Sequence, residues 1–135
     1  MTPVDQTRFA DGEGDCLVAC IATITGVRLA DIPHFCAGHP EGSDAWYPAF
    51  AEWLVRRGYA PLSLSFDEPE AVDEHLKWAR LFGREVAWIA SGRTTRGRHF
   101  VVYLGDSIYH DPNPNYGRSG LQTIQDATFL LRAAS

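Results

Sequence analysis

Three side chains of this sequence are of the types that together perform acyl transfer, and each lies at the edge of an expected structural element. Cys16 stands where a loop turns into an apolar helix, His99 opens a strand-like run, and Asp111 follows the next such run. A thiol attacks a carbonyl as the thiolate, which a neighbouring imidazole generates and the positive end of a helix stabilises. A carboxylate then fixes the tautomer of the imidazole. The pattern predicts Cys16 as nucleophile, His99 as base and Asp111 as orienting acid.

The element that must position the nucleophile is a helix over residues 16–25. Apolar residues recur there at intervals of three and four, and Gly26 is a plausible C-terminal stop. Asp15 is expected to be the N-cap, which leaves Cys16 in the first turn. Backbone N–H groups in that turn lack helical acceptors and are free to bind an oxyanion.

Strands must position the other two residues. Residues 85–90, 99–104 and 107–110 are rich in β-branched and aromatic side chains, with a tight turn predicted at Gly105. A hairpin of this span places Asp111 beside His99 on the neighbouring strand. Three arginines between positions 93 and 98 are expected to form a solvated basic loop, one that gates the site or favours acidic substrates.

The rest of the chain completes an α+β pattern. We expect an extended lead-in over residues 1–13, a loop over 36–43, and a second helix capped by Ser43 or Asp44 and ending at Gly58. An edge strand is predicted over 59–66, a third helix over 69–82, and a final strand rather than a helix over 121–131. This order predicts one domain, residues 1–135, in which N-terminal helices pack on a C-terminal antiparallel sheet.

Composition narrows the class of partner. The chain has 135 residues, with 12 Lys and Arg against 17 Asp and Glu, which gives a net charge of −5. That balance argues against nucleic acid as the main partner. No apolar run is long enough for a membrane span, and no signal peptide is recognised. Three cysteines leave at least one unpaired in a monomer, so we expect reduced thiols and a cytoplasmic location.

The same residues carry a family resemblance. Gly14-Asp15-Cys16-Leu17-Val18-Ala19-Cys20, then His99-Phe100-Val101-Val102-Tyr103, then Tyr109-His110-Asp111-Pro112, resemble the papain-like cysteine peptidases, in particular the C39-like branch of bacteriocin-processing peptidases. In that branch a Gln precedes the Asp-Cys pair, a His opens a strand, and an Asp-Pro follows on the next.

The resemblance implies a papain-like fold and the roles given above, with Gln6 as an oxyanion donor. It covers three short blocks and nothing through residues 36–85. Papain-like enzymes usually place this Gln about six residues before the Cys, where this chain has Ala10. Gln6 lies ten residues ahead of Cys16, so a longer loop has to return it to the site.

The function expected is therefore a thiol-dependent hydrolase, a cysteine peptidase or isopeptidase, that works through a thioester. It requires no cofactor and no metal, and its partner is a peptide or protein substrate. Because no transporter domain is recognised on the chain, a peptidase coupled to export would need a separate partner protein. The substrate, the choice between hydrolysis and acyl transfer, and the oligomeric state stay open.

Several alternatives compete with this interpretation. A register shift of one residue would direct His110 rather than Asp111 to the site, and Asn113 could serve as the orienting group. Cys20 is expected to pack in the core and Cys36 to be a loop thiol. A papain-like binding module without catalysis is a second possibility. A small zinc-binding domain is a third, with ligands drawn from Cys16, Cys20, His34, Cys36 and His39.

Overall fold

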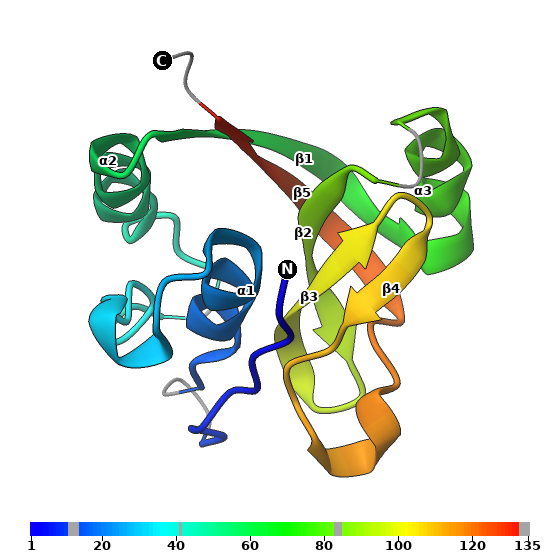
Figure 1. Cartoon of the computed structure of the whole chain (residues 1–135). Coiled ribbons are helices and arrows are strands. Elements are labelled where there is room, and N and C mark those ends of the chain that lie inside the picture. The colour runs from blue at the N-terminus through cyan, green and yellow to red at the C-terminus, as the bar shows by residue number, and fades with distance from the viewer. Residues whose placement is uncertain (11–13, 41, 83–84, 133–135) are drawn as a thin grey trace.

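A five-stranded antiparallel sheet runs through the centre of the molecule, with helices against both of its faces (Figure 1). The computed structural model describes residues 1–10, 14–40, 42–82 and 85–132. Within these residues the strands are β1 Tyr59–Ala71, β2 Ala87–Thr94, β3 Gly97–Leu104, β4 Ser107–His110 and β5 Thr123–Arg132. Their order across the sheet is β1-β5-β2-β3-β4, so the last strand in the chain lies between β1 and β2.

The described residues form three α-helices, α1 Cys16–Thr25, α2 Tyr47–Arg56 and α3 Val72–Ala79. Short 3₁₀ turns occupy Leu29–Asp31, Arg80–Phe82 and Asn115–Arg118. Helix α1 ends at Gly26, whose φ of 77° is left-handed and whose N–H donates to Ala22 O. Glycine adopts that conformation without steric cost, and the chain leaves the helix there.

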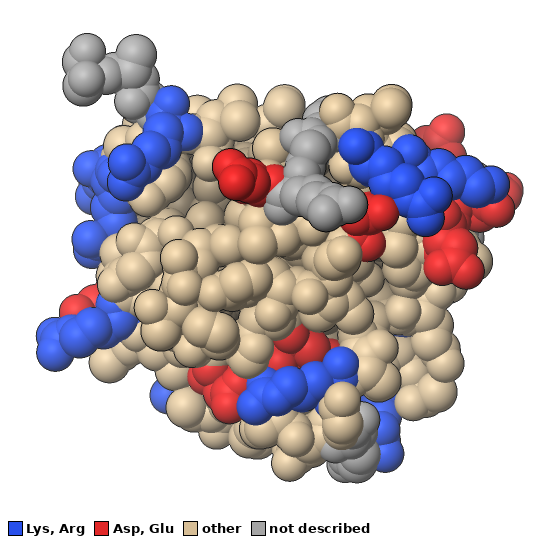
Figure 2. Space-filling view, turned by 45° about the vertical axis from the view of Figure 1, so that its right-hand side comes forward, with Lys and Arg blue, Asp and Glu red and all other residues tan. Residues whose placement is uncertain are grey.

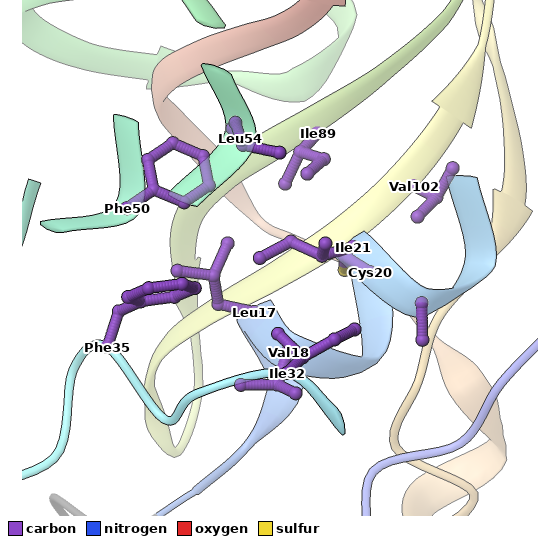
Figure 3. Close-up of a cluster of buried hydrophobic side chains, with 11 residues drawn as sticks. Leu17, Val18, Cys20, Ile21, Ile32, Phe35, Phe50, Leu54, Ile89 and Val102 are labelled. Carbon is purple, nitrogen blue, oxygen red and sulfur yellow. The ribbon is translucent and has the colours of Figure 1, made fainter. Parts of the chain in front are cut away.

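Two apolar clusters form on opposite faces of the sheet, because alternate residues of a strand point to opposite sides. On one face, α1 and α2 pack against Ile89 and Val102, as Figure 3 shows. On the other, α3 packs against a cluster built around Trp88 and Tyr103. The sheet thus has a separate core on each side.

The α+β class, the N-terminal helix and the final strand agree with the sequence-based expectations. The outermost position of β1 also agrees with its predicted edge character. Residues 11–13 of the predicted lead-in lie outside the described residues.

Three sequence-based predictions of local structure were wrong. Helix α3 starts at Val72 rather than near residue 69, because β1 pairs with β5 again at Glu70 and Ala71 after an irregularity that follows Ser65. Helix α2 starts at Tyr47, with Trp46 at its N-cap instead of Ser43 or Asp44. The expected basic loop is no loop, since Arg93 and Arg98 are paired residues of β2 and β3 joined by a tight turn.

None of the helices in the described residues has the length and apolar character that a membrane crossing requires.

Candidate active site

Cys16 is the first residue of α1, and it is partly exposed. It lines a cleft of about 430 Å³ between the helices and the uncovered part of the sheet. Cys36, Trp46 and Phe100 lie on the same cleft. The thiol is therefore open to the cleft, while its backbone belongs to the N-terminal turn of a helix.

His99 and Asp111 meet as the sequence predicts. The Nε2 atom of His99 lies 2.7 Å from Asp111 Oδ1, and both side chains are buried. His99 also makes a side-chain hydrogen bond with Cys16. Because Nε2 is engaged by the carboxylate, Nδ1 is the ring nitrogen left for the thiol. The structure thus brings the three predicted residues together in the order thiol, imidazole, carboxylate.

The electrostatics of His99 follow from these contacts. Burial lowers the pKa of the imidazole, but the hydrogen bonds to Asp111 and Cys16 outweigh it and raise the pKa from 6.5 to about 9. The ring is therefore mainly protonated at neutral pH. An imidazolium is the partner that a thiolate nucleophile requires.

Asp111 is fixed by backbone donors as well as by His99. Its Oδ1 accepts from Asn113 N at 3.0 Å, and its Oδ2 accepts from Gly120 N at 2.9 Å. Burial raises the pKa of this carboxyl, but these bonds and His99 lower it below its ordinary value, so Asp111 is ionised at neutral pH. Asn113 therefore supports Asp111 through its backbone, and the proposed swap of orienting group does not occur.

His110 points to a different partner. Its Nε2 lies 2.9 Å from Asp5 Oδ1, so the alternative register that would direct it to the site is not adopted. Asp5 also pairs with Arg118, whose Nη1 donates at 2.8 Å to the backbone carbonyl of Asp111. This link between the N-terminal segment and the Asp111 loop was missed from sequence, because it joins residues 113 positions apart.

The N-terminal segment lies between α1 and the β3–β4 hairpin (Figure 1). Gln6 N donates to Pro112 O at 2.8 Å, and Gln6 Nε2 donates to Arg8 O at 2.8 Å. A Cβ placed on Gly14 would lie 3.8 Å from Gln6 Nε2, so the Gln6 amide lies beside Gly14, which precedes Cys16 by two residues.

Asp15 holds that segment in place. Its Oδ1 accepts from the backbone N–H groups of Thr7 and Arg8, at 2.9 and 2.8 Å, and its Oδ2 accepts from the Thr7 hydroxyl. Asp15 occupies the N-cap position of α1, but its side chain makes no cap hydrogen bond, contrary to the sequence-based prediction. Its carboxylate instead fixes Thr7 and Arg8, the two residues that follow Gln6, which leaves the first N–H groups of α1 available.

The other two cysteines differ from Cys16. Cys20 is fully buried, and burial raises the pKa of its thiol well above 9.0. Burial likewise raises the pKa of Cys36 to about 12, although Cys36 lines the same cleft as Cys16. Among the described residues, which include all five candidate zinc ligands, no three His, Cys, Asp or Glu side chains gather closely enough to hold a metal ion.

The surface seen in Figure 2 carries its lysines and arginines in separate groups, several of them beside acidic residues. A continuous basic stripe, which follows a nucleic-acid backbone in proteins that bind one, is not present on this face.

Comparison of the chain with protein families, curated proteins and solved structures gives no significant match in any of the three.

Proposed function

We propose that this protein is a cysteine hydrolase of papain-like type that cleaves peptide or isopeptide bonds. The observation that supports this most directly is the arrangement of His99. Its Nε2 is bound by the buried carboxylate of Asp111, and its other nitrogen is left for Cys16 at the start of α1. The chain order Cys, His, Asp and the placement of the Cys on a helix in front of a sheet are those of the family that the sequence resembles.

The reaction proceeds in two balanced steps. The Cys16 sulfur attacks the substrate carbonyl carbon, and His99 holds the thiol proton and delivers it to the departing amine nitrogen as the C–N bond breaks. A thioester of Cys16 and a free amine result. Water then attacks the thioester with His99 as base, which releases the carboxylic acid and regenerates the thiol.

The developing oxyanion has two sources of donors. The backbone N–H groups at the start of α1 lack helical acceptors. Gln6 Nε2 has a second proton beyond the one given to Arg8 O, and it lies beside Gly14. Glycine at position 14 leaves room for the substrate carbonyl to approach these donors.

The first test measures the nucleophile. Limiting iodoacetamide is applied across pH 5 to 9, and intact mass with peptide mapping reports which cysteine is alkylated. We expect Cys16 to react selectively below pH 7 and its rate to fall at least about tenfold in His99→Ala. Cys36→Ser is the matched control, since it removes a thiol of the same cleft and should leave the rate unchanged.

The second test measures turnover on a mixture of fluorogenic peptides. Cys16→Ala should abolish cleavage and keep the fold, as judged by thermal unfolding. Full activity in Cys16→Ala would contradict the proposal.

In the iodoacetamide test, slow and unselective labelling of the wild-type cysteines would instead favour a binding module that has lost catalysis.

A further inference from the structure

The cleft that holds Cys16 has a floor of polar side chains. They come from the face of the sheet that α1 and α2 leave uncovered, and neighbouring strands place them side by side. In the strand pairing, Ser65 of β1 and Ser91 of β2 both lie opposite Asp126 of β5. The next row has Ser63 opposite Thr128, with their hydroxyls 2.9 Å apart. Ser63 also makes a hydrogen bond with the Tyr47 hydroxyl of α2, at 2.8 Å. A floor of hydroxyls and a carboxylate suits a polar ligand better than an apolar one.

Arg98 brings a guanidinium into contact with this floor, and Arg96 of the turn between β2 and β3 also lines the cleft. Arg98 lies on β3, one residue before His99, and its side chain is 29% exposed. Its Nη2 contacts Ser91 Oγ at 3.4 Å and Asp126 Oδ2 at 3.5 Å. Both contacts are longer than the roughly 2.7–2.9 Å of a well-formed guanidinium–carboxylate hydrogen bond.

Because these two contacts are long, most N–H donors of the Arg98 guanidinium remain available to another partner. Arginine has five N–H donors in a planar fork, and here a single nitrogen makes both of the contacts found in the described residues. The remaining edge can take a carboxylate in a bidentate pair, which is stronger in a partly desolvated cleft than in open water.

We propose that Arg98 is a substrate-binding residue that accepts a carboxylate of the acyl donor in the Cys16 cleft, and that Asp126 holds the guanidinium in place until substrate arrives. This specificity rests on the proposed function, because it assumes that Cys16 is the nucleophile. Asp126 then has a double effect, since it orients Arg98 and also competes with the incoming anion.

That double effect separates recognition from a purely structural ion pair. A structural pair is broken equally by changing either partner. A carboxylate receptor is lost when Arg98 is changed, but it becomes stronger when its competing anion, Asp126, is made neutral.

The experiment uses three electrophiles that alkylate Cys16 and differ only in charge. N-bromoacetyl-glutamine amide is neutral, N-bromoacetyl-glutamate amide carries a side-chain carboxylate, and N-bromoacetyl-glutamine carries a main-chain carboxylate. The quantity measured is the rate of Cys16 alkylation by each acid divided by the rate with the neutral amide. The acid with the higher ratio identifies which kind of carboxylate the cleft accepts.

In the wild type, we expect one of the two acids to alkylate Cys16 about ten times faster than the neutral amide, or more. A charge-assisted hydrogen bond to Arg98 is strong enough to account for such a ratio. Arg98→Gln should bring the ratio near or below one, and Arg98→Lys should retain part of it because the charge remains without the fork. Asp126→Asn should raise it. Arg56→Gln, which removes the same charge from an exposed position on α2, is the control and should leave it unchanged.

A ratio near one in the wild type, or a ratio that falls equally in Arg98→Gln and Asp126→Asn, would overturn the proposal. Failure of the proposed function looks different, because then even the neutral amide would not label Cys16 selectively. Rapid neutral labelling with an unchanged ratio would therefore reject the carboxylate receptor alone.

Discussion

The two faces of the sheet share the same strands but carry different side chains. On the face beneath α3, Trp88 stacks on Tyr103 with ring centroids 4.8 Å apart and lies near Trp78 and Phe129, and this face is packed with aromatic rings. The face toward α1 and α2 is apolar only where the helices cover it, and it becomes hydroxylic and charged along the cleft. Strand alternation allows this, because each residue contributes to one face alone.

The difference indicates that stability and chemistry are separable in this molecule. The aromatic cluster lines no part of the cleft, so its side chains contribute mainly to the free energy of folding. Tyr103 is its link to the site, since burial and then the charge of Asp111 raise the pKa of its hydroxyl to about 12. The cleft face carries polar side chains in place of apolar packing, a pattern that is common at functional sites. Substitutions on the two faces should therefore change different measured quantities.

The largest effect on stability is expected from Trp88→Ala. The indole is fully buried and donates to Gly105 O at 2.8 Å, so its removal leaves a cavity and an unpaired carbonyl. We expect a loss of about 3–5 kcal/mol in the free energy of unfolding, measured with urea. The folded fraction should keep its rate of Cys16 alkylation. A large change in that rate at full folding would show that the two faces are coupled.

A smaller loss is expected from Gly92→Ala. A Cβ at this position would lie 1.8 Å from Thr123 O, so β2 and β5 would have to move apart opposite His99. The expected cost is about 1–3 kcal/mol, typical of overpacking, with slower Cys16 alkylation because His99 moves with its strand. Ser91→Ala, at the neighbouring position, is the control and should cost about 1 kcal/mol or less. Equal stability of Gly92→Ala and wild type would contradict the close strand approach.

A third effect concerns the pH dependence of stability. The pKa of His99 is raised from 6.5 to about 9, so the folded protein holds this proton more tightly than the unfolded chain. The resulting stabilisation is fully present below pH 6.5 and is lost as pH rises through about 9. Urea unfolding at pH 6 and pH 9.5 measures it, and His99→Gln should lack this part of the pH dependence.

Much of the site could be predicted because its signals are local. The helical spacing after Cys16, the apolar run after His99 and the turn at Gly105 each lie within a few residues, and together they place the three side chains. The association of His99 with Asp111 followed from one hairpin. The chemistry of the site stays a prediction until it is measured.

The parts that could not be predicted depend on contacts distant in sequence. Nothing near Arg118 indicates that it reaches Asp5 and the Asp111 backbone. Residues 69–71 were expected to begin the third helix, yet pairing of Glu70 and Ala71 with β5 extends β1 to Ala71. Arg98 looked like part of a solvated loop, and only the pairing of β2 with β3 shows that it reaches the cleft floor.

The place of β5 in the sheet has a consequence for biosynthesis. Among the described strands it is the last to be translated, yet it joins β1 to β2 and supplies Asp126 to the cleft. Until residues 123–132 have emerged from the ribosome, β5 is missing and β1 cannot be joined to the β2–β3 hairpin. Such long-range pairing makes folding slow and late. A complete cleft therefore forms only after synthesis has passed β5, so any reactivity that depends on the assembled cleft arises after residues 123–132 have been made.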